Sequence, residues 1–76
     1  MNTERIILTA LNRVHPRLMA IGTLWGEVFM DNGSESYSGF KRALRSLEEK
    51  GQVTVVTGED RDKAKITAEG IARLAE

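Results

Sequence analysis

The chain has 76 residues, no cysteine, and eleven basic side chains balanced by eleven acidic ones. A chain of this length can form one hydrophobic core, so we expect a single domain over residues 1–76. The lack of cysteine excludes a disulfide framework, a catalytic thiolate and a cysteine-based zinc finger. Because the formal net charge is zero, only an uneven distribution of charge could indicate a nucleic-acid partner.

The amino-terminal segment MNTERIILTALNRV does not have the pattern of a secretion signal or a membrane span. Asn12 and Arg13 interrupt its apolar run well short of the ~20 apolar residues that a membrane-spanning helix needs. We therefore expect a cytoplasmic protein without a membrane partner.

Residues 3–14 are predicted to form the first helix. Asn2 or Thr3 can cap its start, and Pro16 ends it because the residue before a proline disfavours the helical conformation. The apolar side chains of this helix share one face: Ile6, Ile7, Ala10, Leu11 and Val14. Residues 16–20 are a connection with room for a short extended piece.

A second helix is predicted over residues 20–30. One face of it carries Ile21, Leu24, Trp25, Val28 and Phe29. Gly22 and Gly26 weaken this helix intrinsically, and we interpret them as positions where another backbone packs closely. The segment DNGSES that follows favours a turn, after which Ser34 or Ser36 can cap the next helix.

The third helix is predicted over residues 36–50, with Gly51 as its carboxy-terminal cap. A β-hairpin is predicted to follow it. The hairpin consists of the β-branched run VTVVT (53–57), the turn GEDRD (58–62) and the alternating run KAKIT (63–67).

The last segment, TAEGIARLAE, predicts a short helix with Ile71, Leu74 and Ala75 on one side. These side chains can pack on the first helix of the same chain or on a partner, so the sequence leaves open whether the chain forms a homodimer. The expected fold class is α+β, with a three-helix bundle, a two-stranded β-hairpin and a short carboxy-terminal helix.

The third helix is strongly amphipathic at about 100° per residue. Its apolar side carries Tyr37, Phe40, Leu44 and Leu47. The opposite side carries Ser38, Lys41, Arg42, Arg45 and Glu49. This polar side is either a solvated surface with an ordinary Arg45–Glu49 pair, or a surface that meets a polyanion.

Catalytic and metal-binding chemistry has no support in the sequence. His15 is the only histidine, and no second histidine or cysteine is available to complete a metal site. The serines of residues 34–38 have no nearby base, and no glycine-rich phosphate loop is present. We therefore expect no enzyme, no metal and no cofactor.

We expect the aromatic side chains Trp25, Phe29, Tyr37 and Phe40 to face the core, which argues against base stacking on them.

Two segments resemble winged helix-turn-helix proteins. FKRALRSLEEKGQV resembles the recognition helix and exit of MarR-type and related regulators, where two leucines three apart precede Glu-Glu-Lys-Gly and a strand. ITAEGIARL resembles their Leu-Thr-x-x-Gly segment after the second wing strand. The resemblance spans nearly the whole chain and implies that the third helix enters the DNA major groove.

The resemblance also implies roles for individual residues of the third helix. Ser36, Ser38 and Gly39 occupy its first turn, where small side chains let the helix approach the groove. Lys41 and Arg42 are candidates for base edges, because arginine can pair with guanine through two hydrogen bonds. Arg45, one turn later, is expected to contact phosphate. Tyr37 is expected either in the core or at a phosphate that its hydroxyl contacts.

The turn GEDRD departs from the pattern of MarR-type wings, which usually carry an Asp–Arg pair in a longer, net basic loop. It keeps Asp60 and Arg61 but is short and also contains Glu59 and Asp62. Either Arg61 reaches a minor groove with Asp60 holding its side chain, or these residues form a solvated turn. An acidic tip would repel phosphates.

Two classes of function follow from these observations. The first is a small transcriptional regulator that binds double-stranded DNA through Ser36, Ser38, Lys41, Arg42, Arg45 and Arg61. The second is a winged-helix module for protein–protein contact, which the zero net charge and the acidic turn favour. Binding of RNA or of a replication origin is a weaker third interpretation.

Overall fold

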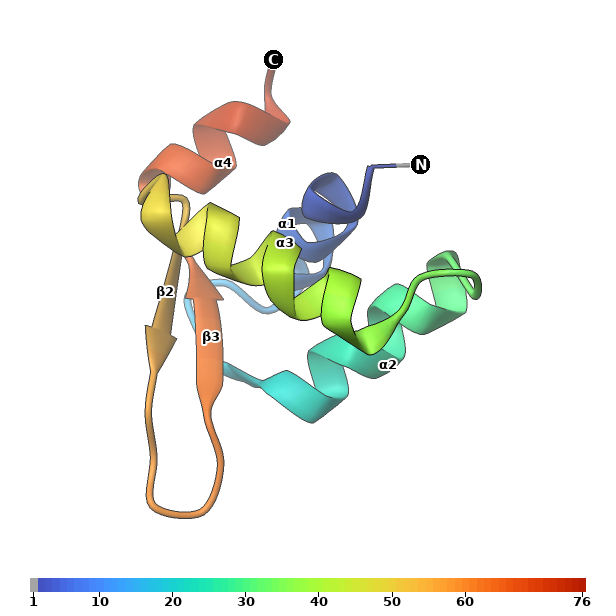
Figure 1. Cartoon of the computed structure of the whole chain (residues 1–76). Helices are drawn as coiled ribbons and strands as arrows, with labels where there is room; N and C mark the ends of the chain where they lie inside the picture. Colours follow the sequence, from blue (N-terminus) through green and yellow to red (C-terminus); the bar gives the residue numbers. More distant parts are fainter. Residues whose placement is uncertain (1) are drawn as a thin grey trace.

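Residues 2–76, the part of the chain that the computed structural model describes, form four helices and three short strands (Figure 1). In chain order they are α1 (Thr3–Val14), β1 (Met19–Ala20), α2 (Ile21–Asp31), α3 (Tyr37–Glu49), β2 (Val53–Val56), β3 (Lys63–Ile66) and α4 (Ala68–Leu74). The α+β class is confirmed, and the predicted helices and hairpin strands agree with the observed ones to within one or two residues.

The sheet has three antiparallel strands in the order β1-β3-β2, not the two strands of the predicted hairpin. Met19 lies opposite Ala64 in the added pair, and the Ile21 backbone N–H donates to the Asp62 carbonyl at 3.1 Å. A strand of two residues is too short to show alternation, and its partner lies far along the chain. Local pattern could therefore locate an extended piece within residues 16–20 but not its pairing.

The core contains side chains from α1, α2 and α3 and from strands β2 and β3. Its largest fully buried members are Phe40, Ile7, Leu8, Leu11, Leu24, Leu47, Ile66, Val28 and Val53. Figure 1 shows α1 lying behind α3, so that the apolar faces of these two amphipathic helices meet. Burial of this apolar area is the main favourable term in folding.

The last helix packs on its own chain. Ile71 and Leu74 are partly buried against the core, and an Arg5 side-chain N–H donates to the Leu74 carbonyl at 3.1 Å. Ala75, predicted to share this face, is exposed. The first helix of the same chain thus covers the apolar side of α4.

Side-chain caps define the starts of three helices. The Asn2 side chain accepts from the Glu4 N–H, Ser36 from the Gly39 N–H, and Thr67 from the Gly70 N–H. Of the alternatives in the sequence, Asn2 and Ser36 are therefore the caps. Gly51 has a φ of +74° after α3, as expected for a left-handed carboxy-terminal cap.

Two predictions about α2 are wrong. Gly22 and Gly26 face open space, with no atom within 4 Å of an added Cβ at either position, so no backbone packs there. Phe29, predicted to face the core, is 51% exposed. The helix lies at the edge of the molecule, and only its narrow stripe of Ile21, Leu24 and Val28 is buried.

No helix in residues 2–76 has the length and apolar composition to cross a membrane.

Candidate nucleic-acid interface

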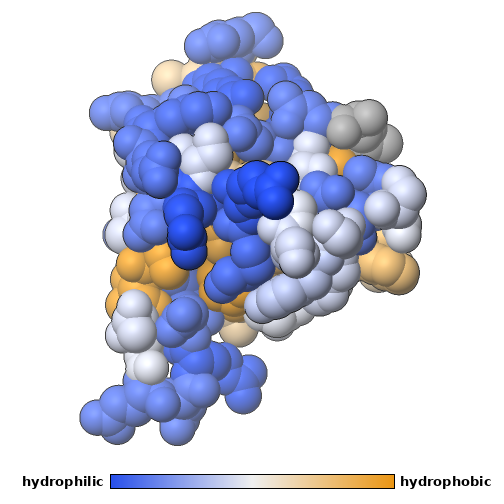
Figure 2. Space-filling view, in the orientation of Figure 1, coloured by the Kyte–Doolittle hydropathy of each residue, from blue (hydrophilic) through white to orange (hydrophobic). Residues whose placement is uncertain are grey.

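The cations of α3 lie on its exposed side. Phe40, Leu44 and Leu47 are buried and anchor the helix, whereas Lys41, Arg42 and Arg45 are exposed. This division follows directly from the helical period, because residues three and four apart share a face. Figure 2 shows strongly hydrophilic side chains near the centre of the face that α3 forms, with an apolar area beside them toward the hairpin.

No carboxylate neutralises these three cations within the described chain. The ion pairs among residues 2–76 join Arg13 to Glu27, Lys50 to Glu4 and Arg73 to Glu4. The predicted Arg45–Glu49 pair is therefore not formed. Because exposed pairs of this kind contribute little energy, solvation of both side chains competes with pairing. The charges of α3 remain available to a ligand.

The cations border two adjoining hollows. The larger is an open depression of about 380 Å³ lined by Tyr37, Ser38, Lys41, Arg42 and Arg45. The smaller, of about 100 Å³, lies where α3 meets α2 and β2, and is lined by Ile21, Lys41, Leu44, Arg45, Glu48 and Val55. Glu48 is the one acid among the residues that line the two hollows, and it lines only the smaller one. The residues around the larger depression are therefore all basic or neutral.

Ser36 and Ser38 have different surroundings at the start of α3. The Ser36 hydroxyl accepts from the Gly39 N–H at 3.0 Å and so caps the helix, whereas the Ser38 side chain is exposed and lines the depression. The backbone N–H groups of Tyr37 and Ser38 have no partner in the described chain and can donate to an anion. The Glu35 carboxylate lies beside this helix end and accepts from the Thr3 hydroxyl at 2.7 Å.

Arg61 lies apart from the other candidate residues. It is exposed in the loop between β2 and β3, which extends away from the helices in Figure 1. It lines a separate depression of about 470 Å³, together with Leu18, Ala20, Gly58, Glu59, Asp60 and Lys63. No hydrogen bond or ion pair joins Asp60 to Arg61 among the described residues, so the predicted support of Arg61 by Asp60 is absent.

The outward face of β3 adds two cations that the sequence interpretation did not assign. Lys63 and Lys65 are exposed, while the alternate residues Ala64 and Ile66 are buried. The alternation of KAKIT was the available signal, since alternate residues of a strand point to opposite faces. Tyr37, expected either in the core or at a phosphate that its hydroxyl contacts, is 51% exposed and borders the basic depression.

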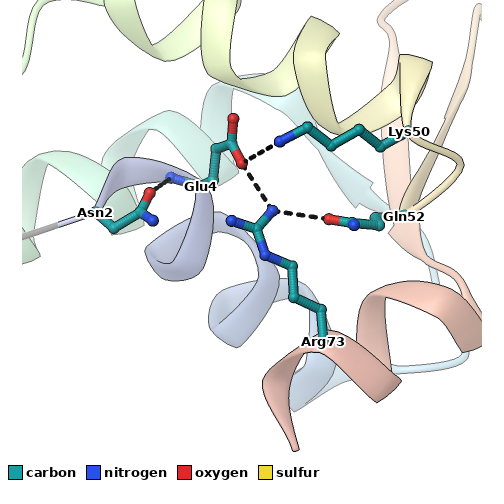
Figure 3. Close-up of polar contacts among 5 residues, drawn as sticks. All are labelled: Asn2, Glu4, Lys50, Gln52 and Arg73. Atoms are coloured by element: carbon teal, nitrogen blue, oxygen red, sulfur yellow. Dashed lines mark hydrogen bonds and ion pairs between the residues drawn. The ribbon is translucent and has the colours of Figure 1, made fainter. Parts of the chain in front are cut away.

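Lys50, the cation directly after α3, is not part of this surface. Figure 3 shows Lys50 and Arg73 converging on Glu4, with Gln52 beside Arg73. The Glu4 carboxylate accepts from Lys50 at 2.9 Å and from Arg73 at 2.7 Å. Partial burial raises the pKa of Glu4, but hydrogen bonds from Arg73, Lys50 and Ser46 lower it more, so the pKa lies below its ordinary value. Lys50 therefore takes part in the contacts that join α1, α3 and α4.

Within residues 2–76, no three histidine, aspartate or glutamate side chains gather in a way that could hold a metal ion.

Neither the family models, nor the curated proteins, nor the solved structures contain a match to this chain.

Proposed function

We propose that this protein is a small winged helix-turn-helix regulator of transcription that binds double-stranded DNA, with α3 in the major groove. The order of elements supports the proposal. The succession of α2, a turn and α3 corresponds to a helix-turn-helix, and the hairpin of β2 and β3 that follows corresponds to a wing. The resemblance of the α3 and α4 segments to MarR-type regulators is consistent with this arrangement.

The observation that carries the proposal is the exposed, unpaired state of Lys41, Arg42 and Arg45 on one helix face. Within the described chain these cations have no carboxylate partner, and they border a depression without an acid. In a protein of zero net charge, this concentration of cations on one surface favours the binding of a polyanion. Lys41 and Arg42 are proposed for base edges, Arg45 for phosphate.

The test is binding of a short mixed-sequence duplex, followed by fluorescence anisotropy over a range of salt concentrations. If the protein makes about four phosphate contacts in all, the log–log slope should be about −3.6. Replacing Lys41, Arg42 and Arg45 together by Ala should abolish binding and leave the helical circular dichroism spectrum unchanged. Undiminished affinity in this variant would place the interface elsewhere.

A matched control removes three charges from other surfaces. Arg5, Arg13 and Arg17 are exposed on α1 and the loop after it, outside both hollows beside α3. Their joint replacement by Ala changes the net charge equally. It should weaken binding far less than the α3 variant, because screening at physiological salt confines the attraction to about 8 Å.

A protein–protein interaction module is the alternative, and it is favoured by the apolar side chains at the end of α2. Met30 is 85% exposed and Phe29 is 51% exposed, next to each other in sequence. Absence of salt-sensitive DNA binding, together with a defined protein partner that the Met30→Asp variant loses, would support this module over the DNA regulator.

Dimerisation is a further part of the proposal that light scattering can test. Ile71 and Leu74 pack within the chain, so they do not require a second copy. If the protein is nonetheless a dimer on DNA, its site should be two-fold symmetric with half-sites about one helical turn apart.

A further inference from the structure

Tyr37 is the first residue of α3, directly after the Ser36 cap, and borders the same depression as Lys41, Arg42 and Arg45. Its side chain is 51% exposed, although the helical period places it on the apolar side. Its hydroxyl has no hydrogen-bond partner among the described residues. The depression therefore contains one large aromatic side chain with a free donor, in addition to its cations.

The Tyr37 ring is held by other aromatic rings. Trp25 meets it edge to face, with ring centroids 5.5 Å apart and planes at 80°. Phe40, which is fully buried, lies 5.9 Å away at 38°. Such contacts restrict the two side-chain torsions of Tyr37, so that little conformational entropy is left to lose when its exposed half meets a ligand.

Resting on the proposed binding of duplex DNA, we infer that Tyr37 is a further DNA-contacting residue. Its hydroxyl donates to a backbone phosphate that the neighbouring cations attract, and its exposed ring edge packs against the deoxyribose next to that phosphate. Tyrosine hydroxyls are common donors to phosphate oxygens. Stacking on a base is not required, because the bases of a duplex are already stacked on one another. A contact of this kind is independent of sequence.

The structure supplies a matched control in Phe29. It is equally exposed, at 51%, and it also meets the Trp25 ring, with centroids 5.6 Å apart and planes at 60°. Phe29 lies on α2, however, and is not among the residues that line the basic depression. Any effect that comes only from loosening the aromatic cluster should therefore be similar for Phe29→Leu and Tyr37→Leu.

The experiment measures affinity for the mixed-sequence duplex against salt for wild type, Tyr37→Phe, Tyr37→Leu and Phe29→Leu, with a thermal melt of each variant. Tyr37→Phe keeps the ring and should lower affinity about ten- to a hundredfold, as expected for loss of one hydrogen bond to a charged group. Tyr37→Leu should lower it further, and Phe29→Leu should bind as wild type. The salt slope should stay unchanged for all three, whereas Arg45→Ala, which removes a proposed phosphate contact, should reduce its magnitude by about 0.9.

The possible failures are distinguishable. If the wild-type protein does not bind duplex DNA, the proposed function itself is wrong. If it binds and both Tyr37 variants bind equally well, only the Tyr37 contact is wrong. Equal losses in Tyr37→Leu and Phe29→Leu, or a reduced salt slope in Tyr37→Phe, would also overturn the contact, because either result would mean that Tyr37 acts through packing. Preferential binding of a single strand that Tyr37→Leu abolishes would overturn the duplex geometry.

Discussion

Arg73 on α4 donates a hydrogen bond of 2.7 Å to Glu4 on α1, joining two side chains that are 69 positions apart. The same carboxylate accepts from Lys50 after α3, so one acid connects three helices. Arg73 also donates to the Gln52 side chain at 2.8 Å. This cluster fixes the carboxy-terminal end of α3 relative to α1 and α4, and it supports the orientation in which α3 exposes its cations.

Replacing Glu4 by Gln should lower the free energy of unfolding at pH 7 by about 1–2 kcal/mol, because two charge-assisted hydrogen bonds lose their ionised acceptor. The pKa of Glu4 is lowered in the folded chain, so its stabilisation is complete above the ordinary value of about 4.5. The stabilisation disappears as the pH falls through the folded pKa. Urea denaturation of both proteins at pH 7 and at pH 3 measures the effect, and the difference should be smaller at pH 3 than at pH 7.

Glu49→Gln is the control for the Glu4 prediction. Glu49 is exposed at the end of α3 and forms no ion pair within residues 2–76, yet its replacement removes the same charge. Its effect on the unfolding free energy should be within about 0.5 kcal/mol at both pH values. An equal loss in the two variants would show that the net charge, and not the Glu4 cluster, stabilises the fold.

Gly70→Ala should destabilise the protein by about 1–3 kcal/mol, the usual cost of forcing extra volume into a packed site. A Cβ on Gly70 would overlap the Gln52 carbonyl oxygen and lie 2.7 Å from Ile66 Cγ1. The oxygen belongs to backbone that already accepts from the Thr67 N–H, so it cannot easily move. Chemical denaturation measures the change, and an unchanged midpoint would mean that α4 can shift away from the sheet.

Gly26→Ala should have the opposite sign and stabilise the protein by up to about 0.8–1 kcal/mol. Gly26 lies inside α2, and no atom lies within 4 Å of an added Cβ. The substitution therefore only restricts the unfolded chain and favours the helix. A raised midpoint in denaturant checks this, whereas a loss of stability would show that a contact at Gly26 matters after all.

Removing acids from the hairpin tip should strengthen DNA binding if the tip approaches the duplex. Glu59→Gln with Asp60→Asn, next to the exposed Arg61, should raise affinity about three- to fivefold, which corresponds to about 1 kcal/mol of Coulomb repulsion removed. The anisotropy titration at low salt measures it. An unchanged affinity would indicate that the tip stays away from DNA and that Arg61 is not a contact.

The division of α3 into a buried and an exposed side could be predicted from sequence alone. Its period places Phe40 and Leu44 on one side and Lys41 and Arg45 on the other, and the structure agrees. The hairpin strands also follow from local preferences. Those preferences limited the caps to Asn2 or Thr3 and to Ser34 or Ser36, and the structure decides for Asn2 and Ser36. In each case the information lies within a few neighbouring residues, because a helix or a tight turn forms between close neighbours.

The remaining features depend on residues far apart in the chain. The pairing of Met19 with Ala64 and the ion pair of Glu4 with Arg73 join segments that have no sequence relationship to each other. The exposure of individual side chains also depends on distant residues. Tyr37 and Phe29 lie on the apolar faces of their helices but are half exposed, because the core does not cover the whole width of either face. Periodicity shows which side chains share a face, whereas how much of that face is covered depends on where the other elements pack.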